Sequence, residues 1–419
     1  MTKTTTQGHR ETRDQKVSKN KTSQRESMPR FASLEKSAKI AEHYGFSLLP
    51  KVQVTRHDMH VARLLRSPAD QIGPFSKVNT DELSAMLRTY TEKYFIGCEQ
   101  QPPMLYFEGS LPRENETSLG ATRQITLDII GSSKSIAEAA LIHTAHVILT
   151  EEYGEDMIVE INSLGDRESA ARFNRELQNY YKKFTSELPT ALRNMLKTDP
   201  SMLVSADHPR AKELALEAPQ SISCLSEASR TQFKEVLEFM ETLGIPYRVN
   251  PSLIANRNVY AETVFVIRKV NQAKDEEPCA IGFRYNPVSK KIGLSKELPA
   301  ARAVIYLEKG KVGHVVKKPK AQKPRKAMFY CIHIGFEAKL KSLSTLEALR
   351  RAKTPVAHSL IKDKLTTQLI SAEQYSAPYI LLMGQKESLE NTVLVRAACN
   401  SSQETVALKD LISYLKKLK

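Results

Sequence analysis

The sequence has no tryptophan and only 7% aromatic residues, and it lacks the run of roughly 18 apolar residues that a membrane-spanning helix needs. The N-terminal stretch has no apolar segment typical of a secretory signal. The five cysteines lie far apart, without a CxxC pair or a Cys/His cluster at metal-ligand spacing. This pattern argues against a disulfide framework and a zinc site. It predicts a reduced, cytoplasmic protein with no metal site of its own.

An excess of positive charge is the one unusual feature of the composition. The 62 Lys and Arg residues outnumber the 47 Asp and Glu residues, which gives a formal charge of +15. Such a charge favours a polyanionic partner, nucleic acid before membrane, although solubility alone is the alternative explanation. With 41% hydrophobic residues, the 419-residue chain can bury a core, and its length predicts two or three domains at roughly 150 residues each.

Changes in composition divide the chain into segments. Residues 1–30 are basic and contain no apolar cluster, so they are expected to form a disordered arm. A second basic segment, KKPKAQKPRK at 317–326, contains two prolines and reads as an extended linker. We therefore expect a large domain at 31–316, with a helical insertion at about 166–245 interrupted at Pro200, and a C-terminal domain at 327–419.

Hydrophobic periodicity predicts the elements of both domains. Alternation at 124–130 predicts a strand with one buried face. The segment at 136–150 is predicted to be a helix and the one at 157–162 a strand, and further strands are expected within 253–308. Beyond the linker, strands alternate with helical segments, and a hairpin and a last helix follow, which predicts a mixed or parallel sheet. The fold class is thus α/β.

Several segments, in order, resemble one protein family. The C-terminal segments IGFEAKLKSLSTLEALRRA, APYILLMGQKES and TVLVRAACNSSQETVALKDLISYL are similar to the anticodon-binding domain of histidyl-tRNA synthetases. VEINSLGDRES, FKEVLEFMETLGIPYRVNPSLI and VYAETVFVI resemble the same family further upstream. The resemblance covers roughly residues 31–419.

This resemblance implies a class II synthetase-type domain, which is an antiparallel sheet with flanking helices, followed by an α/β anticodon-binding-type domain. It also implies a homodimer that binds ATP with Mg²⁺, L-histidine and tRNA, with histidine tRNA as the expected partner. Adenylate formation requires cations at the α-phosphate, because catalysis of this kind is mostly positioning and electrostatics.

The family's motif 2 corresponds to YFEGSLPRENE, which places Arg113 at the catalytic arginine and Asn115 at a glutamate. The next strand places Gln124 and Asp128 where the family has a Gln and a Glu that contact histidine. The segment VNTDE places Asp81 near another family glutamate. These assignments make Arg113 a candidate catalytic residue and Gln124, Asp128 and Asp81 candidate histidine-binding residues.

The family's RGLDYYTRTVFE block reads ANRNVYAETVFV here, so Ala255 replaces a catalytic arginine, while Tyr260 keeps the second tyrosine. Loss of one such preorganised donor typically costs about 10²–10³ in rate. If this segment is a strand, Arg257 points to the same face as Ala255.

Two further blocks complete the comparison with the family. GFRYN, against the family's GGRYD, keeps Tyr285 at the imidazole pocket but puts the bulky Phe283 in place of a glycine. YLEK places Tyr306 at another glycine and Lys309 at an adenine-stacking arginine, and a lysine is not equivalent at a stacked site. Lys309 is therefore a weakened catalytic candidate.

The basic linker is the candidate RNA-binding segment. Lysine and arginine contacts to phosphates give salt-dependent binding without sequence preference, whereas a merely solvated linker would give none. The residues concerned are Lys317, Lys318, Lys320, Lys323, Arg325 and Lys326.

Three functions remain open. The first is a divergent synthetase-like protein that binds tRNA, histidine or both, with impaired aminoacylation. The second is an active but divergent histidine–tRNA ligase. The third is a histidine-sensing regulatory paralogue, which we rank last because such relatives normally lack the C-terminal domain. The replacements at Asn115, Ala255 and Lys309 favour the first function over the second.

Overall fold

The structure is a computed structural model that describes residues 32–49, 52–67, 73–94, 103–111, 124–271, 277–307, 327–400 and 402–418. The arm expected at 1–30 and the linker at 317–326 lie outside these residues. The candidates Arg113 and Lys309, and all the basic residues of the linker, lie outside them as well.

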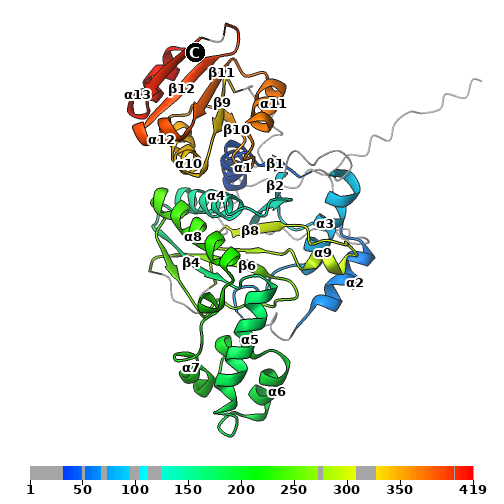
Figure 1. The fold of residues 1–419 in the computed structure, drawn as a ribbon. Coiled ribbons are helices and arrows are strands. Elements are labelled where there is room, and N and C mark those ends of the chain that lie inside the picture. Colours follow the sequence, from blue (N-terminus) through cyan, green and yellow to red (C-terminus); the bar gives the residue numbers. More distant parts are fainter. Residues whose placement is uncertain are drawn as a thin grey trace, which may run out of the picture.

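A large sheet forms the centre of the N-terminal part (Figure 1). It is antiparallel from β2 through β4 and has one parallel pair at each edge. In spatial order its strands are β1 (Ser47–Leu48), β2 (Met104–Glu108), β3 (Gln124–Ile130), β8 (Ala300–Tyr306), β7 (Ala280–Arg284), β6 (Ala261–Lys269), β4 (Met157–Ser163) and β5 (Tyr247–Val249). The antiparallel core implied by the family resemblance is thus present.

Helices cover both faces of this sheet. On one face, α1 (Ala32–His43), α4 (Ile136–Tyr153) and α8 (Glu227–Thr242) share a core with β3, β6 and β8. On the other face lie α2 (Arg56–Leu65), α3 (Thr80–Tyr94) and the short α9 (Val288–Lys291). The expectation that β3 has a single buried face is therefore wrong, because Thr126 and Asp128, which alternate with its apolar residues, are also fully buried.

The sequence explains why α4 runs through the centre of the molecule. Its residues are apolar on nearly all sides, as expected of a helix that is buried between a sheet and other helices. It ends at Gly154, which adopts the left-handed conformation (φ 65°) and donates its N–H to the carbonyl of Thr150.

The segment at 166–245 is mostly helical, as predicted. It contains α5 (Arg167–Lys182), α6 (Thr190–Thr198), η2 (Pro200–Ser205), α7 (Pro209–Ala215), η3 (Ser221–Cys224) and then α8. The predicted break is confirmed, since α6 ends just before Pro200 and Pro200 begins η2. Helices α5 to α7 project away from the sheet, whereas α8 returns to pack beside α4 (Figure 1).

The C-terminal part has its own mixed sheet, in the order β10-β9-β11-β12-β13. The pairs among β10, β9 and β11 are parallel, and β12 and β13 form the predicted hairpin. The short helix α12 was not predicted. The elements are β9 (Phe329–His333), α10 (Phe336–Arg351), β10 (Val356–His358), α11 (Leu365–Tyr375), β11 (Tyr379–Met383), α12 (Gln385–Glu390), β12 (Thr392–Ala397), β13 (Gln403–Ala407) and α13 (Leu408–Lys417).

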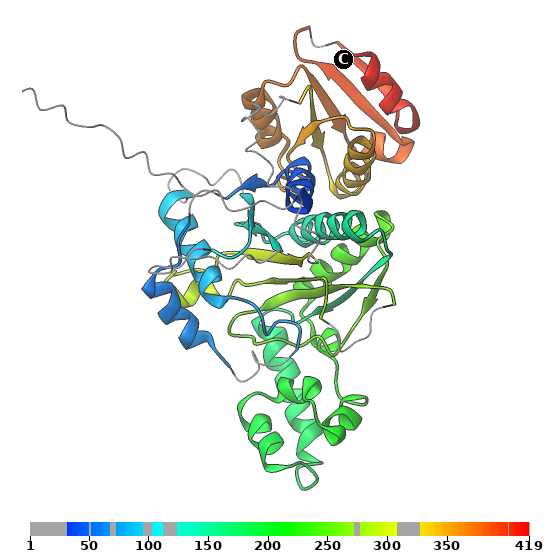
Figure 2. The same cartoon turned by 180° about the vertical axis from the view of Figure 1, so that it is seen from behind.

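The two parts meet along α1, α4, α8 and α10, and both views place α1 between them (Figures 1 and 2). Ile136, Ala139 and Phe239 of the N-terminal part belong to the apolar core of the C-terminal sheet. The rings of Phe239 and Phe336 lie 5.2 Å apart in an edge-to-face arrangement, a favourable geometry for aromatic pairs. The C-terminal part is thus attached through a packed interface.

Candidate functional site

The candidate histidine-binding residues lie on the sheet face opposite α4. Asp128 of β3 is the direct cross-strand partner of Arg302 on β8, and Arg302 is in turn the partner of Phe283 on β7. Side chains of cross-strand partners project from the same face of a sheet. β3 and the later strands β7 and β8 therefore bring an acid, a base and an aromatic ring into one row.

Asp128 is completely buried and has two close polar partners. Its Oδ1 accepts a hydrogen bond from the hydroxyl of Tyr285 at 2.8 Å and another from Nε of Arg302 at 3.0 Å. Full burial, followed by the nearby Asp128 carboxylate, raises the pKa of Tyr285 well above its ordinary value. The tyrosine therefore stays neutral and acts as a donor.

Arg302 is also buried, with 1% of its surface exposed, and its guanidinium lies 5.5 Å from the ring centre of Phe107 and 5.8 Å from that of Tyr285. Burial disfavours its charge, but the Asp128 carboxylate outweighs that effect and the pKa of Arg302 is raised. Sequence reasoning did not select this residue. The feature of the sequence that could have indicated Arg302 is that it is a single arginine within the otherwise apolar segment AARAVIY.

A second carboxylate reaches Arg302 from α3. Oε2 of Glu82 lies 3.4 Å from Nη1 of Arg302, and Oε1 accepts from the backbone N–H of Leu111 at 3.0 Å. Burial raises the pKa of Glu82, and the Arg302 guanidinium offsets only part of that effect. Two carboxylates thus share one guanidinium.

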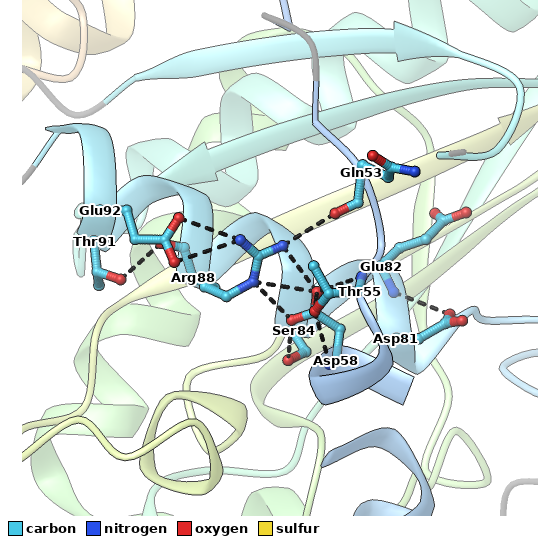
Figure 3. A network of polar contacts seen from close by, with 9 residues as sticks. All are labelled: Gln53, Thr55, Asp58, Asp81, Glu82, Ser84, Arg88, Thr91 and Glu92. Atoms are coloured by element: carbon cyan, nitrogen blue, oxygen red, sulfur yellow. Dashed lines mark hydrogen bonds and ion pairs between the residues drawn. The ribbon is translucent and has the colours of Figure 1, made fainter. Parts of the chain in front are cut away.

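The neighbouring candidate, Asp81, takes a different position. It is half-buried in the first turn of α3, and its Oδ1 accepts from the backbone N–H of Glu82 at 3.0 Å. Figure 3 shows both acids at the start of this helix. The structure brings Glu82, rather than Asp81, to the buried group around Asp128.

An ion pair between α2 and α3 holds α3 in place (Figure 3). Nη2 of Arg88 lies 2.9 Å from Oδ2 of the fully buried Asp58, and the hydroxyl of Ser84 donates to the same carboxylate at 3.0 Å. Asp58 also forms a capping box with Thr55 at the start of α2. These contacts fix the helix that carries Glu82.

Aromatic rings fill the space beside this charged group. The ring of Phe283 lies 4.8 Å from Tyr260 and 6.2 Å from Tyr285, and Phe75 packs on Tyr260 at 5.4 Å. Tyr260 and Tyr285 are buried, so the structure brings these two candidates together with Phe283 between them. Their surroundings form part of a continuous apolar core.

Similarity to known proteins extends over both parts of the chain. A family model described as "Anticodon binding domain" matches residues 326–418. The chain is 25% identical over 351 residues to "Histidine--tRNA ligase" of Bacillus subtilis (strain 168), covering 83% of this chain and 82% of the relative. It is also 26% identical over 311 residues to "Histidine--tRNA ligase" of a Cyanothece species, covering 74% and 72%.

The chain is thus similar to histidine–tRNA ligases over most of its length. A solved structure of apo histidyl-tRNA synthetase from S. aureus covers 92% of this chain and 94% of that one, with a TM-score of 0.49 and 18% identity. Histidyl-tRNA synthetase from Nostoc sp. PCC 7120 covers 92% and 94%, with a TM-score of 0.41 and 16% identity.

Gln124, the remaining candidate histidine-binding residue on the sheet, lies at the start of β3. Its side chain is half-buried, and Nε2 donates to the carbonyl of Gly109 at 3.1 Å. Its cross-strand partner is Tyr306, whose pKa burial raises to about 12. Gln124 lies on the same face of β3 as Asp128, but its side chain is hydrogen-bonded to Gly109 at the start of the strand.

The phosphate side of the family site differs from expectation at Arg257. This residue lies in a turn, so the strand geometry that would place it beside Ala255 does not apply. Its Nη1 donates to the carbonyl of Leu164 at 2.7 Å, and its guanidinium lies 5.5 Å from the ring centre of Phe173 on α5. Burial lowers its pKa to about 10. Arg257 therefore contacts the helical region and is not directed to the side of Ala255.

Among the described residues, no group of three or more His, Cys, Asp or Glu side chains could hold a metal ion. An open hollow of about 670 Å³ lies elsewhere, between the starts of α4, α5 and α8, where Lys134, Asp166 and Glu227 contribute to its lining. The described helices include none that is long and apolar enough to cross a membrane.

Proposed function

We propose that this protein is a histidyl-tRNA synthetase-like protein that binds tRNA and in which aminoacylation is impaired. The observation that carries the proposal is the hydrogen bonding of Asp128, whose Oδ1 accepts from both Tyr285 and Arg302 inside a packed core. In the family, the acid at this position contacts the substrate histidine. Here the chain's own side chains surround it.

The phosphate side supports the same proposal. Adenylate formation places charge on the α-phosphate, and preorganised cations there typically contribute about 10²–10³ in rate each. Ala255 supplies no cation, and Arg257 is hydrogen-bonded to Leu164. The described residues on this side therefore do not fit ATP with Mg²⁺ as the family binds them, and we derive no step through that group.

The C-terminal domain supports the RNA-binding half of the proposal. It matches an anticodon-binding family over nearly its whole length, and the chain carries a formal charge of +15. The relatives are named histidine–tRNA ligases, so histidine tRNA is the partner we propose. Phosphate contacts of the basic linker would add salt-dependent affinity. A cytoplasmic location and a homodimer are further parts of the proposal, inherited from the family.

Two assays on the full chain test this function. The first is histidine-dependent ATP–pyrophosphate exchange, with the Bacillus subtilis ligase as the positive control. The second is filter binding of histidine tRNA over a series of salt concentrations. We expect exchange at background and salt-dependent tRNA binding. Exchange clearly above background would establish the active ligase instead, and loss of tRNA binding would remove the RNA-binding role.

A further inference from the structure

We propose that Arg302 is a built-in substitute for a bound cationic ligand, so that the amino-acid pocket of this chain is filled by its own side chain and excludes free histidine. The inference rests on the proposed function in one respect, which is the assignment of Asp128 to the histidine pocket. It goes further by naming the residue that closes the pocket and the class of ligand that this residue replaces.

The first argument is geometric. Arg302 lies directly across from Asp128 in the register of β3 and β8, and its Nε is 3.0 Å from Oδ1 of Asp128. The same oxygen accepts from Tyr285. A free histidine that used this carboxylate would have to displace a guanidinium held by the backbone of the adjacent strand. Such an intramolecular group is present at a high effective concentration.

The second argument concerns charge. Asp128 and Glu82 both lie within reach of Arg302, and all three are almost completely buried. Two buried carboxylates without a cation are costly, because desolvation of an ion must be offset by a partner. The site therefore requires one positive charge, and in the described structure Arg302 supplies it.

The third argument comes from buried polar atoms that have no partner. Within the described residues, Oγ1 of Thr126, Oδ2 of Asp128 and Nη2 of Arg302 have no hydrogen-bond partner. Thr126 and Asp128 are two positions apart on β3, so they project from one face of the sheet. Buried groups of this kind are normally satisfied. Donors and acceptors gathered on one face are what a small polar ligand would use, and the guanidinium satisfies only some of them.

The fourth argument is that the ligand class follows from the surroundings. The guanidinium lies 5.5 Å from the ring centre of Phe107 and 5.8 Å from that of Tyr285, and such aromatic neighbours favour a flat cation over a compact ammonium. Removal of the Arg302 side chain would leave a cavity with aromatic walls and two carboxylates. The cations that match it are flat and small, such as an imidazolium or a guanidinium.

The experiment compares the wild-type chain with Arg302→Ala by thermal unfolding and calorimetric titration. The ligands are L-histidine and methylguanidinium at millimolar concentration, with sodium chloride at equal ionic strength as the reference. For wild type we expect no saturable shift in Tm and no heat of binding. For Arg302→Ala we expect a lowered Tm that one or both ligands raise in a saturable way, because a ligand that binds only the folded state stabilises it.

Arg284 offers a matched control. It is equally buried, lies on the neighbouring strand β7, and pairs with Glu138 of α4 on the opposite face of the sheet. Arg284→Ala removes the same side chain from a buried pair outside the candidate pocket. We expect it to lower Tm as well, but without a histidine-dependent recovery.

Three outcomes would overturn the assignment. They are saturable histidine binding by wild type, a folded Arg302→Ala protein that responds to neither ligand, and equal histidine recovery in Arg284→Ala. If Arg302→Ala does not fold, its refolding yield in methylguanidinium is compared with that in sodium chloride. A higher yield supports the proposal and an equal yield overturns it. Binding of tRNA by wild type is measured separately, so its loss would remove the proposed RNA function and leave the role of Arg302 standing.

Discussion

The hydroxyl of Tyr44 donates a hydrogen bond to the Glu347 carboxylate, which joins the end of α1 to α10 across 303 sequence positions. Arg350 completes this contact. Its Nε lies 3.1 Å from the Tyr44 hydroxyl and 2.8 Å from Oε2 of Glu347, and its Nη1 pairs with Glu151 of α4. One cluster thus connects the first helix, the central helix and the C-terminal domain.

Glu347→Gln should destabilise the protein at neutral pH. Burial alone would raise the pKa of Glu347, but hydrogen bonds from Arg350 and Tyr44 outweigh it and lower the pKa from 4.5 to about 2. At 1.36 kcal/mol per unit of pKa, the loss should be about 3 kcal/mol. This contribution is complete above pH 4.5 and is lost as the pH falls through about 2.

Urea unfolding of wild type and Glu347→Gln at several pH values between 7 and 3 checks this prediction. The difference between the two proteins should shrink below pH 4.5. The exposed Glu373, on α11, provides the matched control as Glu373→Gln. A difference that is unchanged at low pH would show that the carboxylate charge is not what stabilises the contact.

Glu262→Gln should stabilise the protein at alkaline pH. Burial raises the pKa of Glu262 to about 7 from 4.5, and the residue also has a positive φ of 51°. Because the charged form is disfavoured in the folded state, stability is lost as the pH rises from 4.5 towards 7. The variant should gain about 3 kcal/mol over wild type at pH 8 and little at pH 4.

This prediction is checked by measuring, as a function of pH, the difference in the free energy of unfolding between Glu262→Gln and wild type. Buried His143 acts in the opposite direction over nearly the same range. Burial lowers its pKa to about 4, so the stability that it costs at low pH is regained as the pH rises to 6.5. Since both proteins contain His143, its effect cancels in the difference. A gain of equal size at pH 4 and pH 8 would show that the buried carboxylate charge is not its cause.

Restoring the lost cations should not restore catalysis. Ala255→Arg combined with Lys309→Arg returns the family's residues to the phosphate side. We nevertheless expect histidine-dependent ATP–pyrophosphate exchange to stay at background, because Arg302 and Phe283 still fill the amino-acid side. A rise in exchange in this double variant would contradict that explanation. The informative comparison is between the folded double variant and the same variant that also carries Arg302→Gly and Phe283→Gly.

Neutralisation of the basic linker should weaken RNA binding. Replacement of Lys317, Lys318 and Lys320 by alanine should lower tRNA affinity and reduce the slope of log K against log salt by about one unit per lost phosphate contact. Filter binding at several salt concentrations measures both quantities. The exposed lysines Lys290, Lys291 and Lys296 form a control set of equal charge. An unchanged slope in the linker variant would exclude the linker as a contact.

The sequence predicted the elements better than the site. Periodicity located β3, α4 and the alternating elements of the C-terminal domain, because those patterns reflect local burial. It failed for the polar face of β3, since Thr126 and Asp128 are buried by helices from elsewhere in the chain. Local alternation carries no information about what covers the second face.

The buried group around Asp128 depends on the register of the strands and on the rotation of α3 about its axis, and single residues in a sequence reveal neither. Arg302 faces Asp128 only because β8 pairs with β3 in one register. Glu82 and Asp81 are neighbours, and the orientation of α3 decides which of them reaches the core. The expected position of Arg257 assumed a strand, and the turn found there directs its guanidinium to Leu164 instead.

The position of α1 has a consequence for the order in which the protein matures. Tyr44 is synthesised early, but its partner Glu347 follows 303 residues later. At about 5–20 residues per second, the ribosome needs roughly 15–60 s to produce that partner. During this interval the side of α4 that carries Ile136 and Ala139 lacks its partners from the C-terminal part. The docking of α10 therefore has to wait for its own synthesis, and a nascent chain arrested before that point would present this surface to chaperones.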